Sequence, residues 1–218
     1  MMLKILSSKT SILNQYLAEI RDIEIQKDSL RFRRNMERIG EIFAYEISPF
    51  LKWENKDVVT SLGTAHCQTL IQQPVIATIL RAGLPMHQGL LNYFDKAENA
   101  FISAYRKHHK DNSFDIKIEY ISSPDLNNKT LILSDPMLAT GASMVLAYKE
   151  LLHQGTPSHT HIVSVLASAQ GVEYVKKHMP VGSYTLWLGA VDEELTAQSY
   201  IVPGLGDAGD LAFGIKNG

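Results

Sequence analysis

The chain has 218 residues and a formal net charge of -2, with 45% hydrophobic and 20% charged residues. This composition supports a buried core, and it argues against disorder and against nucleic acid or an anionic membrane surface as the main partner. The single cysteine, Cys67, cannot form an internal disulfide, and no stretch approaches the ~20 apolar residues of a membrane-spanning helix or resembles a signal peptide, so we expect a cytoplasmic protein.

The first part of the chain is predicted to be helical. Apolar residues from Ile12 to Ile20 recur at helical spacing, and Ser11 is a candidate N-cap. A second helix is expected to start near residue 28 or 29 and to end before Pro49. Because both helices precede any strong strand signal, we interpret residues 1–50 as a helical extension that packs on the domain or contributes to a dimer contact.

Strands and helices alternate in the rest of the chain. Strand character begins at residues 58–59, and the run 75–80 is apolar on both faces, as expected of a central strand covered by helices. Such alternation predicts a parallel sheet with right-handed crossovers in a single domain that spans residues 1–218. Further strands are predicted at residues 100–104, 116–120, 131–133, 162–167 and 184–188, and helices at residues 86–93, 143–153 and 171–177.

The strongest chemical signal follows the predicted strand 131–133. That strand delivers Asp135 at its carboxyl end, where open α/β sheets bind ligands. Residues 139–143 then lead into a helix, so their backbone N–H groups and the Thr140 and Ser143 hydroxyls could bind a phosphate. Asp135 could accept from ribose hydroxyls or stabilise positive charge on a ribose carbon. An ordinary strand-to-helix turn is the alternative interpretation of this motif.

Two arginines are expected at the same edge of the sheet. Arg81 follows the strand 75–80, and Arg106 follows a predicted strand that ends at Tyr105. A guanidinium presents fixed donors that match phosphate oxygens, although a lone arginine after a strand is more often a surface charge. Two arginines beside a phosphate loop favour the binding of a diphosphate.

Residues 200–210 cannot form regular structure, because Gly204, Gly206 and Gly209 follow Pro203 closely. The segment nevertheless keeps apolar residues, which flexible tails usually lack. We interpret it as an ordered loop whose exposed peptide groups could match the edge of a flat base such as uracil.

Three segments together resemble uracil phosphoribosyltransferase: Ile-Leu-Arg-Ala-Gly-Leu at 79–84, Asp-Pro-Met-Leu-Ala-Thr-Gly at 135–141, and residues 200–210. The resemblance implies a type I phosphoribosyltransferase-like parallel sheet flanked by helices, with an N-terminal helical extension and a β-hairpin arm. It implies that uracil and 5-phospho-α-D-ribose 1-diphosphate (PRPP) give UMP and diphosphate. It also implies Mg²⁺ bound mainly through PRPP, a homodimer or homotetramer, and GTP as a candidate effector.

By matching position, the resemblance also assigns roles to individual residues. Arg106, Asp135 and Asp207 would be catalytic, and residues 190–214 would form the base-recognition loop. Uracil would be bound by Ile201, Gly206, Asp207 and Ala208. PRPP would be bound by Arg81, Arg106, Asp135, Pro136, Met137, Leu138, Ala139, Thr140, Gly141, Ala142, Ser143 and Asp207.

The sequence departs from the family pattern at several positions. Pro85 and Ala142 replace usual glycines, and Leu211 replaces a usual basic residue. Basic residues occupy 107–110, where acidic residues and a threonine are usual; we favour a solvated loop tip there over charge that faces diphosphate.

Three alternatives stay open. The first is a regulator that binds PRPP or UMP without catalysis. The second is a phosphoribosyltransferase for another base. A Rossmann enzyme is disfavoured, because no Gly-x-Gly-x-x-Gly follows the first strong strand.

Overall fold

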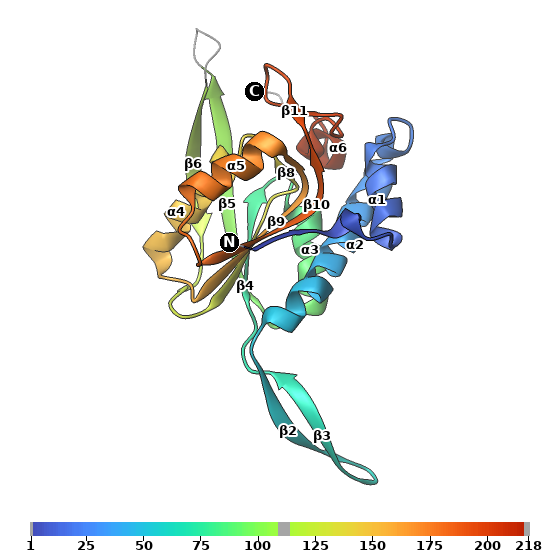
Figure 1. Ribbon diagram of the computed structural model, residues 1–218, viewed down its shortest axis with the longest axis vertical. Coiled ribbons are helices and arrows are strands. Elements are labelled where there is room, and N and C mark those ends of the chain that lie inside the picture. Colours follow the sequence, from blue (N-terminus) through green and yellow to red (C-terminus); the bar gives the residue numbers. More distant parts are fainter. Residues whose placement is uncertain (1, 109–113, 216–218) are drawn as a thin grey trace.

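A mostly parallel sheet forms the centre of the protein (Figure 1). The computed structural model describes residues 2–108 and 114–215, and within them eight strands make this sheet, in the order β1-β10-β9-β7-β4-β5-β6 with β8 paired to β9. The strands are β1 (Met2–Ile5), β4 (Val75–Leu80), β5 (Glu98–His108), β6 (Phe114–Ser122), β7 (Thr130–Ser134), β8 (Met137–Leu138), β9 (His159–Ser168) and β10 (Tyr184–Asp192).

Helices cover both faces of this sheet, as the sequence predicted (Figure 1). One face packs against α1 (Ile12–Arg21), α2 (Ser29–Ile47), α3 (Leu84–Tyr93) and α6 (Ala208–Phe213), and the other against α4 (Ala142–Leu151) and α5 (Ala169–His178). In β4, Ile76 faces the first layer while Val75 and Ala77 face the second, which explains why the strand is apolar throughout. Short 3₁₀ turns lie at Leu6–Ser8, Ile25–Lys27, Ser48–Phe50 and Leu152–Gln154.

The predicted cap at Ser11 and the predicted start of the second helix near residue 28 are both confirmed. The Ser11 hydroxyl accepts from Leu13 N–H, and Asn14 completes a capping box at the start of α1. The Asp28 carboxylate accepts from the N–H groups of Leu30 and Arg31 at the start of α2. These side chains satisfy backbone donors that have no partner within the helix.

The predicted parallel sheet is confirmed, and one antiparallel strand, β6, pairs with β5 at its edge. The expectation for Arg106 is wrong. Strand β5 continues to His108, so Arg106 does not follow a strand but lies inside β5, opposite Ile116 of β6. Lys107 and His108 also belong to β5 rather than to a loop tip, whereas residues 109 and 110 fall outside the described part of the chain.

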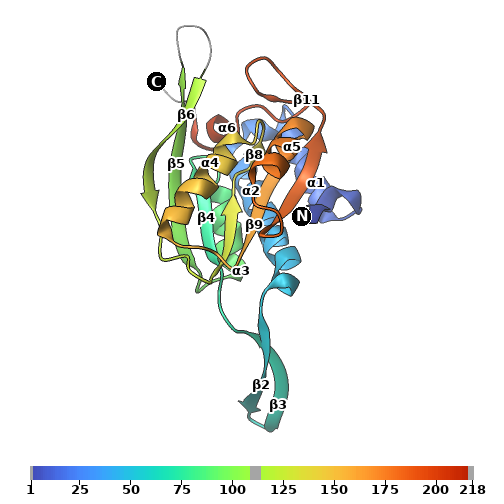
Figure 2. The same cartoon turned by 60° about the vertical axis from the view of Figure 1, so that its left-hand side comes forward.

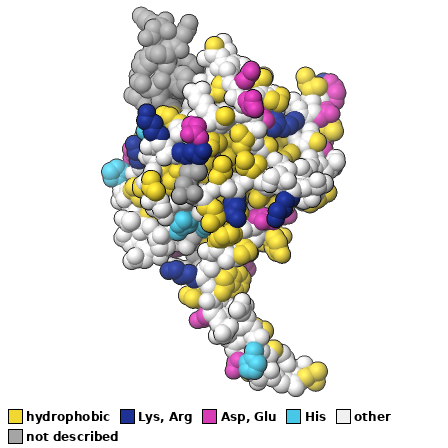
Figure 3. All heavy atoms as spheres, viewed as in Figure 1, with side chains coloured by type: hydrophobic (Ala, Val, Ile, Leu, Met, Phe, Trp, Pro, Cys, Tyr) yellow, Lys and Arg dark blue, Asp and Glu magenta, His cyan; other side chains and the backbone are white. Residues whose placement is uncertain are grey.

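The expected β-hairpin arm is present and projects from the body of the protein (Figures 1 and 2). It consists of β2 (Trp53–Thr60) and β3 (Gly63–Leu70). Every residue of β2 is exposed, including the residues 58–59 that gave the first strand signal. Hydrophobic side chains are exposed to solvent at the end of the arm (Figure 3), where Val59 is 85% and Leu62 is 98% exposed.

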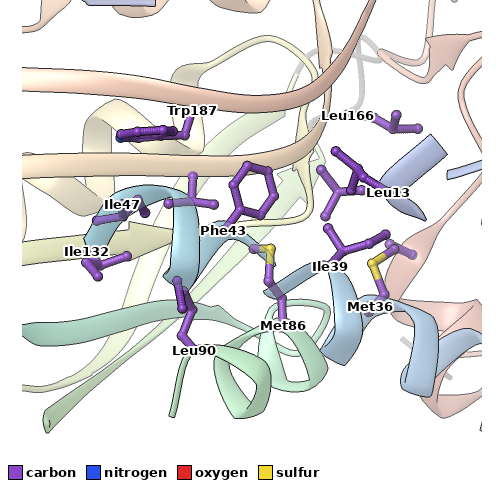
Figure 4. Close-up of a cluster of buried hydrophobic side chains, with 14 of the residues drawn as sticks. Leu13, Met36, Ile39, Phe43, Ile47, Met86, Leu90, Ile132, Leu166 and Trp187 are labelled. Atoms are coloured by element: carbon purple, nitrogen blue, oxygen red, sulfur yellow. The ribbon is translucent and has the colours of Figure 1, made fainter. Parts of the chain in front are cut away.

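The largest buried side chains join the N-terminal helices to the sheet (Figure 4). Phe43 of α2, Met86 of α3 and Trp187 of β10 all belong to this cluster. The indole Nε1 of Trp187 donates to Nδ1 of His161 at 3.0 Å, so the imidazole proton must lie on Nε2. Burial, together with the neighbouring His159, lowers the pKa of His161 from 6.5 to about 3.

This buried histidine predicts a pH-dependent stability. The folded protein keeps His161 neutral, whereas the unfolded chain takes up a proton below pH 6.5. Its contribution to stability is therefore complete above pH 6.5 and is lost as the pH falls toward 3. We expect His161→Gln to flatten the decline of the free energy of unfolding between pH 7 and pH 5, measured by urea denaturation. Parallel declines in the two proteins would contradict this account.

Candidate active site

The candidate site lies where parallel strands end, at the end of the protein opposite the arm (Figure 1). Strands β4 and β7 are neighbours, with Thr78 in register with Ser134. Arg81 therefore leaves β4 beside the point where Asp135 leaves β7. The Thr78 hydroxyl donates to the Ser134 carbonyl at 3.3 Å, and the Ser134 hydroxyl donates to the Ala77 carbonyl at 3.1 Å, which ties the two strand ends together.

Residues 135–143, called the 135–143 loop below, form a small hollow at the start of α4. The backbone reverses at Gly141, whose φ of 78° is a conformation that glycine adopts without strain. Ala142 N–H donates to the Thr140 hydroxyl at 3.4 Å. A pocket here is lined by Asp135, Met137, Leu138, Ala139, Thr140, Gly141, Ser143 and Met144. Except for Met144, these lining residues were all predicted PRPP contacts.

Residues at the start of α5 hold this loop from behind. The Ser168 hydroxyl donates to the Ala139 carbonyl at 2.5 Å and accepts from Gly171 N–H at 2.8 Å. A Cβ atom on Gly171 would lie 2.4 Å from the Ala139 carbonyl oxygen and 2.5 Å from that of Leu138. Only glycine permits this approach. Sequence reasoning missed both residues, because neither lies in a recognisable motif.

Residues 201–210, called the 201–210 loop below, form the second part of the site. Strand β12 (Ile201–Val202) pairs with β11 (Glu194–Leu195), and Asp207 then caps α6 by accepting from Asp210 N–H at 2.9 Å. The side chains of Ile201 and Ala208 are buried, whereas Gly206 is exposed. The segment is anchored by its apolar side chains, but the expectation that residues 200–210 form no regular structure is wrong, because Ile201 and Val202 form β12 and α6 begins at Ala208.

Arg81 connects the two parts of the site. Its Nη2 donates to Asp210 Oδ1 at 3.0 Å and to the Gly214 carbonyl at 3.2 Å. The sequence predicted Arg81 as a phosphate ligand, but it did not predict this contact with the segment that follows Asp207. Asp135 is the first residue of the 135–143 loop, and Asp207 lies within the 201–210 loop. The side chain of Arg106 falls outside the described part of the protein.

Two departures from the family pattern fit the backbone. Pro85 occupies the first turn of α3, where the missing N–H and fixed φ of proline are favourable. Ala142 begins α4 and does not have a positive φ, so it needs none of the backbone freedom of glycine.

The described residues contain no group of three or more His, Cys, Asp or Glu side chains that could hold a metal ion. They also contain no helix long and apolar enough to cross a membrane.

A turn at a strand end that leads into a helix N-terminus, beside a second loop, is the arrangement with which α/β enzymes bind phosphorylated ligands. The family model for uracil phosphoribosyltransferase matches residues 7–215. The chain therefore belongs to the uracil phosphoribosyltransferase family, as its motifs indicated. Its mostly parallel sheet with helices on both faces agrees with the fold that this resemblance implied.

Individual relatives agree with this assignment. The chain is 56% identical to a uracil phosphoribosyltransferase of Porphyromonas gingivalis over 97% of both chains. It is 40% identical to one of Methanothermobacter thermautotrophicus, over 86% of this chain and 85% of the relative. The solved structure of the AQ2163 protein from Aquifex aeolicus superposes with a TM-score of 0.86 at 27% identity and covers 98% of this chain and 99% of that one.

Proposed function

We propose that the protein transfers the phosphoribosyl group of PRPP to uracil and so forms UMP and diphosphate in pyrimidine salvage. The observation that carries this proposal is that the 135–143 loop and the 201–210 loop both adjoin the end of β4, the second of them through Arg81. One loop suits a ribose phosphate and the other suits a flat base. Membership of the family supports the same reaction.

The 135–143 loop would bind the ribose 5-phosphate of PRPP. Its small residues let a phosphate approach the backbone N–H groups at the start of α4, and the Thr140 and Ser143 hydroxyls add donors. Asp135 would accept from the ribose hydroxyls. The guanidinium of Arg81, which is partly exposed beside this loop, would bind the diphosphate together with Arg106.

Uracil would bind to peptide groups of the 201–210 loop. Ile201, Gly206, Asp207 and Ala208 would supply backbone donors and acceptors, because their side chains are buried, absent or engaged in capping α6. Backbone recognition suits uracil, whose edge alternates carbonyl oxygens and N–H groups. The Asp207 carboxylate would also contact PRPP.

Catalysis would come from positioning and electrostatics. The uracil nitrogen bonds to the anomeric carbon as the bond from that carbon to diphosphate breaks, and the nitrogen gives up its proton to the departing diphosphate or to water. Asp135 would stabilise the positive charge that develops on the ribose. Mg²⁺ would be bound mainly through PRPP, where it would neutralise the diphosphate, and the carboxylates of Asp135 and Asp207 are the kind of oxygen ligand that it prefers.

The reaction can be tested directly. We expect the protein to form UMP from labelled uracil, PRPP and Mg²⁺, and we expect Asp135→Asn to lose at least about 10²-fold in kcat. The D135N substitution keeps an oxygen that can accept from Met137 N–H, a contact of 3.4 Å, so the loop should keep its shape. Tight binding of UMP or PRPP without turnover would instead favour a non-catalytic regulator.

The contact between Gly171 and the 135–143 loop gives a second prediction. Gly171→Ala places a methyl group against two carbonyl oxygens and should displace the loop from its phosphate-binding shape. We expect KM for PRPP to rise at least about tenfold, the equivalent of 1.4 kcal/mol. Gln170→Ala, at an exposed position of the same helix, is the matched control. If both variants keep the wild-type KM for PRPP, the support from α5 is unimportant.

We also propose that the protein is a homodimer or a larger homo-oligomer in the cytoplasm, where an unpaired cysteine such as Cys67 stays reduced. The exposed apolar end of the arm supports an intersubunit contact. We expect Leu62→Lys to shift the mass measured by light scattering toward the monomer. Val181 is 87% exposed in a turn outside the arm, so Val181→Lys should leave the mass unchanged. A monomeric wild-type protein would refute the proposal.

A further inference from the structure

A partly buried ion pair between Arg21 and Asp192 lies directly behind the 201–210 loop. Asp192, the last residue of β10, is only 8% exposed. Its carboxylate accepts from Arg21 Nη1 at 2.7 Å and from Arg21 Nη2 at 2.8 Å, which is a two-pronged contact between α1 and the sheet. A carboxylate this deeply buried is costly unless its hydrogen bonds are satisfied, and the bidentate contact with Arg21, whose side chain is 24% exposed, supplies two of them.

Both members of this pair also hold the backbone of Gly204. Asp192 Oδ2 accepts from Gly204 N–H at 3.0 Å, and Arg21 Nη1 donates to the Gly204 carbonyl at 3.0 Å. Gly204 has a φ of 55°, and a Cβ atom there would lie 2.1 Å from the Ile201 carbonyl oxygen. The ion pair thus fixes a tight turn between Ile201 and Gly206, two of the proposed uracil contacts.

The N-terminal helices hold the same region at further points. With its amide oriented to satisfy its neighbours, Gln26 donates to the Leu205 carbonyl at 2.9 Å. Arg33 Nη1 donates to the Ala212 carbonyl at the end of α6, at 2.6 Å. Helix α1 is itself locked to α2, because the buried Glu19 carboxylate accepts from Arg31 and Asn35.

We propose that Arg21 and Asp192 are positioning residues that set the affinity of the enzyme for uracil through Gly204, without touching either substrate. This inference rests on the proposed function. A loop that recognises a base through peptide groups cannot adjust its donors and acceptors by choosing rotamers, so their placement depends on what supports the backbone. The 135–143 loop has separate supports in Ser168 and Gly171. Loss of the ion pair should therefore affect uracil far more than PRPP, to which the 201–210 loop contributes only Asp207.

The test is a comparison of the two Michaelis constants. We expect Arg21→Ala to raise KM for uracil at least about tenfold, while KM for PRPP changes less than about twofold. Arg21→Lys keeps a charged donor but cannot make the bidentate contact with Asp192. It should therefore raise KM for uracil less than Arg21→Ala does. Arg34→Ala is the matched control, because it removes an exposed ion pair with Glu37 from the same helical layer and does not contact the loop.

The possible failures can be told apart. If Arg21→Ala melts at a lower temperature but keeps its KM for uracil, or if both Michaelis constants rise equally, the ion pair is merely structural and the inference is overturned. Should Arg21→Ala not fold, Asp192→Asn provides the same comparison, since its amide keeps the shape of the carboxylate. A wild-type protein that forms no UMP would defeat the proposed function itself, whereas active wild type with an unaltered variant would defeat only the positioning role.

Discussion

The parallel alignment of β4, β7, β9 and β10 is the constraint on which the rest of the structure depends. Parallel neighbours end at a common edge, so residues far apart in sequence leave the sheet side by side there. Arg81 follows β4 and Asp135 follows β7, while Ser168 and Asp192 end β9 and β10. Helices on both faces bury most residues of these strands. A shift of one residue in any strand would exchange its two apolar faces and displace its contribution to the site.

The last residues of β9 and β10 each support one of the two loops of the site. Ser168 and Asp192 are partners in the sheet register. Ser168 binds the backbone of the 135–143 loop at Ala139, and Asp192 binds the backbone of the 201–210 loop at Gly204. One edge of the sheet therefore places both loops, and each loop keeps its own anchor. The N-terminal helices belong to this arrangement, because Arg21 completes the second anchor.

Local signals in the sequence predicted much of this structure. Ser11 and Asp28 cap the first two helices, and the apolar run of β4 is central and buried on both faces, because each feature depends on neighbouring residues. The 135–143 and 201–210 segments were recognisable for the same reason. The hairpin arm was expected only from family resemblance. The strand propensity of β2 does not indicate whether the strand packs against the body of the protein or projects from it.

Features that depend on distant residues could not be predicted. Arg21 and Asp192 are 171 positions apart, and no local pattern joins them. Gly171 looks like an ordinary helical residue until the carbonyl groups of the 135–143 loop are placed against it. The antiparallel pairing of β5 with β6 places Arg106 inside a strand. The register of this pairing could not be predicted from the sequence.

The most direct test of the central claim, that one sheet edge places a phosphate loop beside a base loop, is a crystal structure of the protein with UMP. We predict the phosphate of UMP against the backbone N–H groups of the 135–143 loop, and the uracil ring against peptide groups of the 201–210 loop. A nucleotide bound elsewhere, or a uracil ring held by side chains away from residues 201–208, would contradict the account.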